Sequence, residues 1–468
     1  MLPGPRSLPP AAVEPSPMAG EDPGAEPTPP RAKAPPVVGL LPQFIRSRSE
    51  VLNRLYRELG PCFELPLGGE APTVLAGPEM ARFATKDAGK VLRAGPSNLP
   101  FVQAFGGSNM MLGSDLEAHS QRRRALMPSF TPAAVMRMVP EFERCAREMA
   151  LSWVGQPAFE LLPELKRLVT RQTGLALVGS DSSAVHDSLC RFFDLAIAMC
   201  FARVPAPIVR VFGYEKQRAR VLDFAQSLLD ARLAIPVPER PGDFLDLILA
   251  ARDADGSPLE PGEARGLVLT PFIGGLDTVS HTLAFLLYEV LVDPALRARC
   301  QAEADHLFEG GSLRSERFRE LPTLTAAALE TLRFHPVTEV GQRVAAEDFE
   351  FEGYRVARGT PLILAWTVGN FVDTHFAESQ RFDVDRFLPP RSEGAHHNGA
   401  FGFGPHRCIG AKLGEVQLIV TLATLLHATA PRLERPAAPL KTSSLVALKP
   451  VNLKLVVEAR SAAAQTGP

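Results

Sequence analysis

The sequence lacks the cysteine and histidine spacing of a metal finger or of a disulfide-stapled secreted domain. No two of its 6 cysteines form a C-x-x-C pair, and none stands at a finger-like spacing from a histidine. Cysteines used in this way are typical of a reducing compartment. We therefore expect a cytoplasmic protein in which the cysteines other than Cys408 are buried thiols.

The sequence also lacks an excess of charge of either sign. Its 50 Lys and Arg residues nearly balance its 52 Asp and Glu residues, which leaves a formal net charge of -2 and no sign of a nucleic-acid partner. The N-terminus has no charged-then-apolar signal region, and no run of about twenty apolar residues predicts a membrane span. With 46% hydrophobic residues, the chain has the composition of a globular protein, which we expect to be a monomer.

Large apolar residues are scarce at both ends of the chain. A segment of this kind cannot offset its ordering entropy by burial. We therefore expect a disordered Pro/Ala-rich extension over residues 1–36, one domain over residues 37–457 and a disordered tail over residues 458–468. The abundance of Ala, Arg, Gly and Pro, including 44 prolines, is typical of a GC-rich bacterial genome.

Hydrophobic periodicity predicts a mainly α-helical domain with a small β region, an α+β fold. Residues 47–59 and 263–291 have helical patterns, whereas residues 62–67 and 73–77 have the patterns of short strands. Residues 91–112 are apolar without a regular pattern, and we expect an irregular loop there that covers a pocket.

The residues with the clearest chemistry lie in a glycine-rich loop from Phe401 to Gly410. Gly402, Gly404 and Gly410 permit tight turns and the close approach of the backbone to a flat group. The loop places Cys408 just before an apolar helical pattern, where the helix dipole and free N–H groups favour a thiolate. A buried structural cysteine is the alternative for this residue.

A second motif lies inside the longer helical pattern. Pro271, Gly274 and Gly275 should weaken the helix, and a distorted helix interior often marks a functional site. Asp277 and Thr278 follow, and a carboxylate beside a hydroxyl can organise proton transfer through water. The alternative is a kinked core helix in which these two side chains cap backbone groups.

Two further spacings place charged residues on shared helix faces. His119 and Arg123 stand four residues apart, and two cations on one face can hold carboxylates. Glu330 and Arg333 stand three residues apart in an alanine-rich helical pattern. An exposed acid–base pair of this kind would contribute little to stability.

These motifs, in this order, resemble those of the cytochrome P-450 family. The family's haem-binding signature, F-x-x-G-x-(R/H)-x-C-x-G, is met by Phe401, Gly404, His406, Cys408 and Gly410. The segment from Gly274 to Thr278 resembles the family's (A/G)-G-x-(D/E)-T signature. The pairs H-x-x-x-R and E-x-x-R described above resemble two more of its elements.

The resemblance implies a cytochrome P-450 fold in which haem b, iron protoporphyrin IX, lies between the helix of Thr278 and the helix that follows Cys408. Cys408 would be the metal ligand. The other residues implied to contact haem, through its propionates or through the loop, are His119, Arg123, Arg343, Phe401, His406 and Gly410.

The resemblance assigns two further sets of residues. Gly274 and Gly275 would leave space for dioxygen, and Asp277 and Thr278 would deliver protons. A structural network behind the haem loop would be formed by Glu330, Arg333 and Arg386. The sequence departs from the family nearby, where Ser379 replaces a usual proline.

The pocket is the least defined part of the prediction. The substrate candidates are Phe101, Phe105, Met110, Phe272, Val337, Glu339, Val340 and Leu445. Glu339 is the exception among them because an acid buried without a partner is costly. It would bind a polar or basic substrate group, or else point at Arg343 or at solvent.

The implied activity is that of an oxidoreductase, a cytochrome P-450 monooxygenase of bacterial secondary metabolism. It would use O2 to hydroxylate or epoxidise a lipophilic small molecule such as a terpenoid, steroid, fatty acid or polyketide. Electrons would come from a separate ferredoxin or flavodoxin with its reductase, and the docking candidates are Arg122, Arg124, Arg407 and Lys412. The alternatives are a peroxygenase, a haem-thiolate isomerase and a non-catalytic haem-based sensor, against which the Asp277–Thr278 pair argues.

Overall fold

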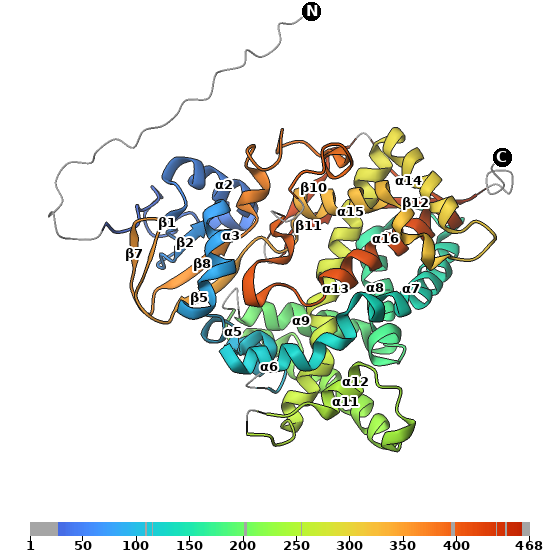
Figure 1. Cartoon of the computed structure of the whole chain (residues 1–468), viewed down its shortest axis with the longest axis horizontal. Coiled ribbons are helices and arrows are strands. Elements are labelled where there is room, and N and C mark those ends of the chain that lie inside the picture. The colour runs from blue at the N-terminus through green and yellow to red at the C-terminus, as the bar shows by residue number, and fades with distance from the viewer. Residues whose placement is uncertain are drawn as a thin grey trace, which may run out of the picture.

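The computed structural model describes residues 27–460 apart from residues 108–109, 115, 201–203, 254, 395–397, 437 and 445–446. Helices make up most of the described chain, and the larger sheet lies at one side of the molecule (Figure 1). Leu445, one of the predicted pocket residues, lies outside the described residues.

The described elements follow one another in three groups. The first group contains α1 (Leu41–Arg46), α2 (Arg48–Leu59), β1 (Cys62–Glu64), β2 (Thr73–Ala76), α3 (Gly77–Lys86), α4 (Ala88–Val91), β3 (Leu92–Arg93), α5 (Gly95–Ala104) and α6 (Leu116–Leu126). The second is mostly helical and contains α7 (Pro132–Trp153), β4 (Phe159–Glu160), α8 (Leu161–Thr173), the π-helix η3 (Gly174–Val178), α9 (His186–Cys200), α10 (Ala206–Val211), α11 (Tyr214–Leu233), α12 (Phe244–Ala250), α13 (Pro261–Val292), α14 (Pro294–Leu307) and α15 (Pro322–Phe334). The third contains β5 (Gly341–Ala345), β6 (Phe349–Phe351), β7 (Tyr354–Val356), β8 (Pro361–Ala365), η8 (Val384–Phe387), η10 (Gly399–Phe401), η11 (Gly404–His406), α16 (Ala411–Ala428), β9 (Thr429–Leu433), β10 (Lys441–Ser443), β11 (Lys449–Val451) and β12 (Lys454–Ala459).

The larger sheet joins strands from both ends of the chain in the order β1-β2-β8-β5-β3. β2 and β8 pair in parallel, with Leu75 opposite Leu364, and the other pairs are antiparallel. Every residue of β2 is buried, because side chains pack on both faces of the sheet. A second sheet, β4-β12-β9, closes the opposite side of the molecule.

Residues 30–32 lie before the predicted boundary at residue 36 and pair with β1. Ala32 N donates to Glu64 O (3.0 Å), Glu64 N donates to Pro30 O (2.9 Å), and the Ala32 side chain is buried. At the other end β12 runs to Ala459, past the predicted domain end at residue 457. Backbone hydrogen bonds to neighbouring strands hold both segments, and composition does not reveal such bonds.

α13 is the central helix of the molecule and packs against α8, α11, α15 and α16 (Figure 1). Pro271 and the two glycines that follow it do not end the helix, which is continuous from Pro261 to Val292. α13 is also long and apolar enough to cross a membrane, but 61% of its most apolar window is buried within the protein. Burial of this kind is what the core helix of a globular protein requires.

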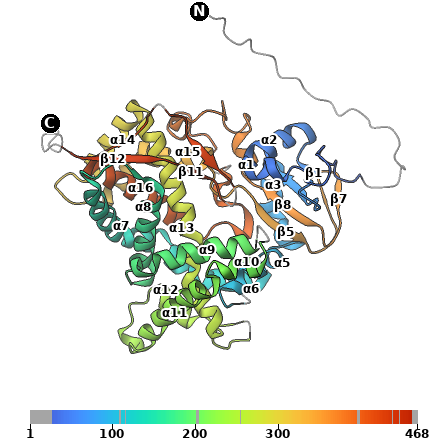
Figure 2. The same ribbon diagram turned by 180° about the vertical axis from the view of Figure 1, so that it is seen from behind.

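The prediction of an irregular loop over residues 91–112 is wrong in its middle, where α5 runs from Gly95 to Ala104. Pro96 occupies the first turn of α5, where its missing N–H costs nothing, and Pro100 lies inside the helix. In the view from behind, α9 lies between the α5–α6 region and α11 (Figure 2). These helices cover the side of α13 that carries Phe272.

Candidate active site

The loop that carries Cys408 is held by close backbone contacts. η10 and η11 form its two turns, and Cys408 N donates to Phe401 O (2.9 Å). Gly404 has a φ of +70°, and a Cβ on it would lie 2.0 Å from Ala84 O on α3. Only glycine fits such a close approach at a positive φ. The loop therefore delivers Cys408 to a fixed place just before α16.

Cys408 opens onto a recess inside the protein. Its side chain is accessible, yet burial raises the pKa of the thiol, and the Gly410 backbone, Arg123 and Arg407 lower it only in part. An accessible thiol that is nonetheless desolvated lines an enclosed space rather than the outer surface. A cationic ligand such as iron would reverse this balance, because metal coordination deprotonates a thiol.

Four nitrogen-bearing side chains gather beside this loop. The rings of His119 on α6 and His406 in η11 lie 4.0 Å apart, and Arg123 Nη1 donates to Arg407 O (2.7 Å). Burial, together with Arg343 on β5, His119 and Arg123, lowers the pKa of His406 to about 3. The structure thus brings together these four residues from three separate segments of the chain. The positive charge of the two arginines and the N–H donors of the cluster can bind carboxylates.

The glycines of α13 leave open space in the middle of a buried helix. A Cβ built on Gly274 or Gly275 would meet no atom within 4 Å outside the helix, although Phe272 and Leu276 on either side are buried. The hydrophobic cluster that contains Phe272 and Leu276 also packs against Ile409 and so reaches the cysteine loop. The residues present therefore fit a flat group with an apolar face and two acid groups, which is the chemistry of haem.

Asp277 and Thr278 are adjacent in α13 but make different contacts. Thr278 Oγ1 donates to Gly274 O (2.6 Å), whereas Lys166 Nζ on α8 lies 2.6 Å from Asp277 Oδ1. Burial raises the pKa of Asp277, but the positive charge of Lys166 opposes burial, and the pKa lies below its ordinary value. Sequence analysis missed Lys166, because nothing in its local pattern connects it with α13.

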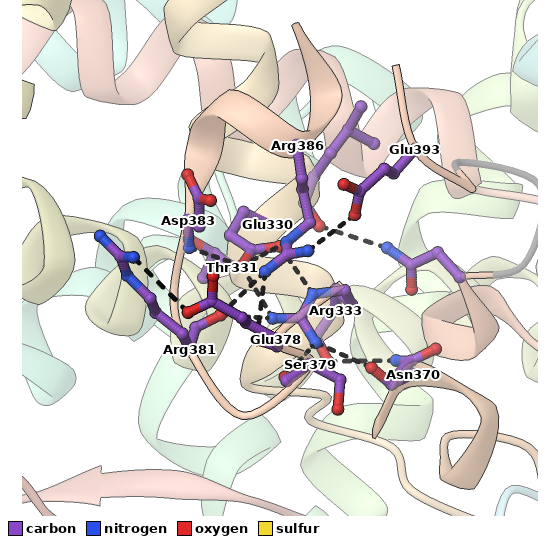
Figure 3. A network of polar contacts seen from close by, with 12 residues as sticks. Glu330, Thr331, Arg333, Asn370, Glu378, Ser379, Arg381, Asp383, Arg386 and Glu393 are labelled. Carbon is purple, nitrogen blue, oxygen red and sulfur yellow. Dashed lines mark hydrogen bonds and ion pairs between the residues drawn. The ribbon is translucent and has the colours of Figure 1, made fainter. Parts of the chain in front are cut away.

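Glu330, Arg333 and Arg386 form one fully buried network (Figure 3). Glu330 Oε2 accepts from Arg333 Nε (2.7 Å), and Glu330 Oε1 accepts from Arg386 Nε (3.1 Å). Arg333 also donates to the backbone carbonyl of Ser379 (2.8 Å), so the residue that replaces the usual proline lies within the network. Five-donor guanidinium groups suit such a junction of side chain and backbone acceptors.

Asn370 connects this network to the cysteine loop. Arg333 Nη1 donates to Asn370 O (2.8 Å), Asn370 Nδ2 donates back to Arg333 O (3.1 Å), and Asn370 Oδ1 accepts from Gly399 N (2.9 Å) at the start of η10. Asn370 is fully buried. Sequence analysis assigned no role to Asn370, because its partners Arg333 and Gly399 are far away along the chain.

The predicted pocket residues do not all come together. Four of them share one hydrophobic cluster, namely Phe101, Phe105, Met110 and Phe272. Val337 is buried, but Val340 packs against the cluster of the N-terminal sheet instead. Beside the first four, an open pocket of about 590 Å³ lies between α5, α9 and α11 and is lined in part by Gln103, Met199, Tyr214 and Arg218.

The prediction that Glu339 faces substrate, Arg343 or solvent is wrong. Its side chain is 1% exposed, its Oε1 accepts from Ser49 N (2.9 Å) and Ser49 Oγ (2.5 Å), and its Oε2 accepts from Arg48 Nη1 (3.3 Å). Glu339 therefore caps the start of α2, where the helix dipole favours an anion. No local pattern connects residue 339 with α2, so the sequence could not show this.

Arg122 does not belong to an exposed docking surface. Its side chain is 1% exposed and pairs with Glu263 on α13 (3.0 Å) and with Asp253 (3.3 Å). Arg124 and Lys412 are exposed on the surface, and Arg407 is exposed in the cysteine loop. Of the four basic residues expected on a docking surface, Arg122 is therefore excluded by its burial.

Comparisons with known proteins agree with this geometry. The family model described as Cytochrome P450 matches residues 28–457. The chain is 26% identical over 403 residues to a sterol 14alpha-demethylase of Mycolicibacterium vanbaalenii, covering 83% of this chain and 88% of that protein. It is 25% identical over 425 residues to a cyclooctat-9-en-7-ol 5-monooxygenase of Streptomyces melanosporofaciens, covering 85% and 91%.

Solved structures share the fold. The haem domain of cytochrome P450DA has a TM-score of 0.81 at 21% identity, covering 93% of this chain and 99% of that one. A cyanobacterial CYP120A1 with bound retinoic acid also has a TM-score of 0.81, at 20% identity, covering 93% and 100%. With the family model spanning nearly the whole described chain, the protein belongs to the cytochrome P-450 family.

Proposed function

We propose that this monooxygenase inserts one oxygen atom from O2 into a C–H or C=C bond of a lipophilic small molecule. Members of the family are haem-thiolate proteins, and the matched relatives include a monooxygenase and a demethylase. The observation that carries the proposal is Cys408, an accessible but desolvated thiol at the end of a rigid loop and before a long helix.

The residues around Cys408 would have different roles in binding haem b. Cys408 would ligate the iron, Phe401 and Gly410 would shape the loop around it, and Arg123 and Arg343 would neutralise the propionates. His119 and His406 would add hydrogen bonds, and the lowered pKa of His406 keeps its ring neutral at pH 7. When bound, haem supplies the activation of dioxygen, and the protein supplies its ligand, its protons and a shaped cavity.

Asp277 and Thr278 would move the protons that this chemistry consumes. The hydroxyl hydrogen of Thr278 points at Gly274 O, which leaves the lone pairs of Thr278 Oγ1 to accept a hydrogen bond from water. Asp277, held beside Lys166, would take up a proton and pass it on through water. Gly274 and Gly275 would keep the space beside Thr278 open.

The substrate would be a bulky apolar molecule such as a terpenoid or a steroid. The aromatic cluster of Phe101, Phe105 and Phe272 offers an apolar surface, and the open pocket between α5, α9 and α11 adds room beside it. The two relatives named above act, by their names, on a sterol and on cyclooctat-9-en-7-ol. A panel of such molecules, tested for a shift of the haem absorption band, would rank them.

Electrons would come from a separate ferredoxin or flavodoxin with its reductase. Arg124, Arg407 and Lys412 offer exposed positive charge for an acidic partner. All six cysteines are free thiols, which supports a reducing, cytoplasmic location.

The test is the absorption spectrum of the reduced protein with carbon monoxide, for wild type and C408S. A strongly red-shifted Soret band in wild type alone supports thiolate ligation. An unshifted band in wild type contradicts it. Product formation that needs both O2 and a reductase chain then separates a monooxygenase from a peroxygenase or isomerase.

A further inference from the structure

Asp277 lies between two side chains that the haem site does not use. Lys166 Nζ is 2.6 Å from Asp277 Oδ1, and His281 Nε2 is 3.8 Å from the same oxygen. His281 is on α13 one turn after Asp277, and its side chain is 3% exposed. The three residues form a cluster between α8 and α13 in which His281 is buried and Lys166 and Asp277 are partly buried.

The contacts of His281 fix which of its nitrogens carries a hydrogen. Its Nδ1 lies 3.1 Å from Leu448 O, and a carbonyl oxygen can only accept, so Nδ1 is the donor. Burial lowers the pKa of His281 to about 4, although Asp277 opposes this shift, and the ring is therefore neutral at pH 7. Nε2 then presents a lone pair, and among the described residues it has no hydrogen-bond partner.

A lone pair on Nε2 cannot bond to a carboxylate, because both groups only accept. It can accept from a protonated carboxyl, whose O–H is a donor. The ammonium of Lys166 has the opposite preference, since it stabilises the carboxylate and gains nothing from the neutral acid. Asp277 thus stands between a partner for its charged form and a partner for its protonated form.

We propose that His281 is a positioning residue for proton delivery, because it accepts a hydrogen bond from Asp277 only while the carboxyl holds a proton. This inference rests on the proposed role of Asp277 as proton carrier and deepens it. His281 makes the protonated acid less costly inside the protein, and Lys166 restores the charged form once the proton has left. No covalent step is involved, and only the carboxyl O–H changes its partner.

Other charged groups face this cluster from neighbouring elements. Asp194 and Cys190 on α9 act on Lys166, and Lys449 on β11 acts on both Asp277 and His281. Lys449 and Lys166 favour the carboxylate, while Asp194 opposes it. Removing His281 changes none of these groups, so its effect can be measured against a constant background.

The experiment is an infrared pH titration of the haem-loaded protein, in which the carboxylic acid band of Asp277 is identified by its loss in D277N. In H281L we expect the midpoint of this band about one pH unit lower than in wild type, a tenfold loss of proton affinity. H281Q places an amide oxygen near the position of Nε2 and should stay close to wild type. H427Q, which alters the partly buried His427–Asp305 pair elsewhere in the molecule, is the matched control.

The sign of the shift decides between two roles for His281. If His281 acted as a cation, its removal would raise the midpoint, because an opposite charge would be lost. Three outcomes would overturn the inference. The midpoint in H281L could be raised or unchanged, or it could fall equally in H427Q. The Asp277 band could also be absent at every pH at which the wild type stays folded. If H281L does not fold, H281N replaces it, since its shorter amide ends before the position of Nε2.

A second measurement tests the assigned tautomer without reference to turnover. In protein labelled with ¹⁵N-histidine and held in the diamagnetic ferrous carbon monoxide form, the signals of His281 are those lost in H281Q. We expect a neutral ring protonated at Nδ1 at pH 7, and a shifted Nε2 signal in D277N, whose amide N–H mimics the protonated acid. An imidazolium, or a ring protonated at Nε2, contradicts the inference, whereas failure of the monooxygenase function alone would leave both measurements unchanged.

Discussion

The imidazole rings of His119 and His406 lie 4.0 Å apart at an angle of 38°. His119 belongs to α6 and His406 to the cysteine loop, so this contact joins two segments that are distant in the sequence. Arg123, one turn after His119, donates to Arg407 O in the same loop (2.7 Å). The position of Cys408 therefore depends on α6 as well as on α16.

His406 should make the haem-free protein sensitive to acid. The pKa of His406 is about 3 in the folded protein, because of burial and of Arg343, His119 and Arg123, and about 6.5 in an unfolded chain. Between these values the unfolded chain binds a proton that the folded protein does not, so stability falls as the pH falls. We expect H406F to lose less stability than wild type in this window, by at most about 1.4 kcal/mol per pH unit.

Urea unfolding of the haem-free protein at several pH values measures this difference. H306Q removes a more exposed histidine and serves as the control. Parallel stability curves for wild type and H406F would show that His406 does not titrate in this window.

The network around Glu330 should be a large contributor to stability. E330Q leaves the buried guanidinium group of Arg333 without a countercharge and leaves Arg386 paired with Glu393 alone, and breaking a buried pair typically costs roughly 3–5 kcal/mol. E141Q breaks a pair of the same spacing, Glu141–Arg144, whose side chains are 42% and 43% exposed. That loss should be below about 1 kcal/mol. Urea unfolding and haem retention of the two variants compare them directly, and equal losses would contradict the prediction.

Glu339 should matter for stability and not for the choice of substrate. E339Q keeps an acceptor for Ser49 but removes the charge that Arg48 pairs with, so we expect a loss of roughly 1–3 kcal/mol. The ratio of dissociation constants for a quaternary ammonium amphiphile and a neutral alcohol of equal chain length should not change. A selective loss of affinity for the cation would place Glu339 in the pocket after all.

Exposed basic residues beside the cysteine loop should affect electron transfer, whereas the buried Arg122 should affect stability. Replacing Arg124, Arg407 and Lys412 together by Ala should slow reduction by an acidic ferredoxin and weaken the dependence of its rate on salt. R122A should instead destabilise the fold, because Arg122 is buried against Glu263. Stopped-flow reduction at several ionic strengths measures the first effect, with R432A on β9 as the exposed control. Identical salt dependence in the triple variant and wild type would exclude this docking face.

Hydrophobic periodicity correctly predicted helices whose pattern lies within one continuous segment of the sequence. The helix expected over residues 47–59 is α2 (Arg48–Leu59), and the helix expected over residues 263–291 is α13 (Pro261–Val292). α5 was missed because Pro96 and Pro100 hide the helical pattern. Both prolines are tolerated there, one in the first turn and one inside a short helix packed into the core.

Pairings between distant segments could not be predicted in the same way. The partners of Glu339 are Arg48 and Ser49, and the partner of Asp277 is Lys166, each far away in the sequence. The relation of Asp277 to His281 is different, because two residues four apart in a helix share a face. That spacing was present in the sequence, whereas the neutral ring and the lack of a hydrogen-bond partner for Nε2 among the described residues were known only from the structure.

The close packing of the cysteine loop limits how this protein can be engineered. A Cβ on Gly399 or Gly404 would lie 2.0 Å from a backbone oxygen, of Trp366 or of Ala84. Because backbone cannot move aside as a flexible side chain can, mutant libraries that vary these two glycines should yield mostly inactive clones. Variation aimed at the open pocket between α5, α9 and α11 leaves the loop intact, so the search for altered selectivity belongs there.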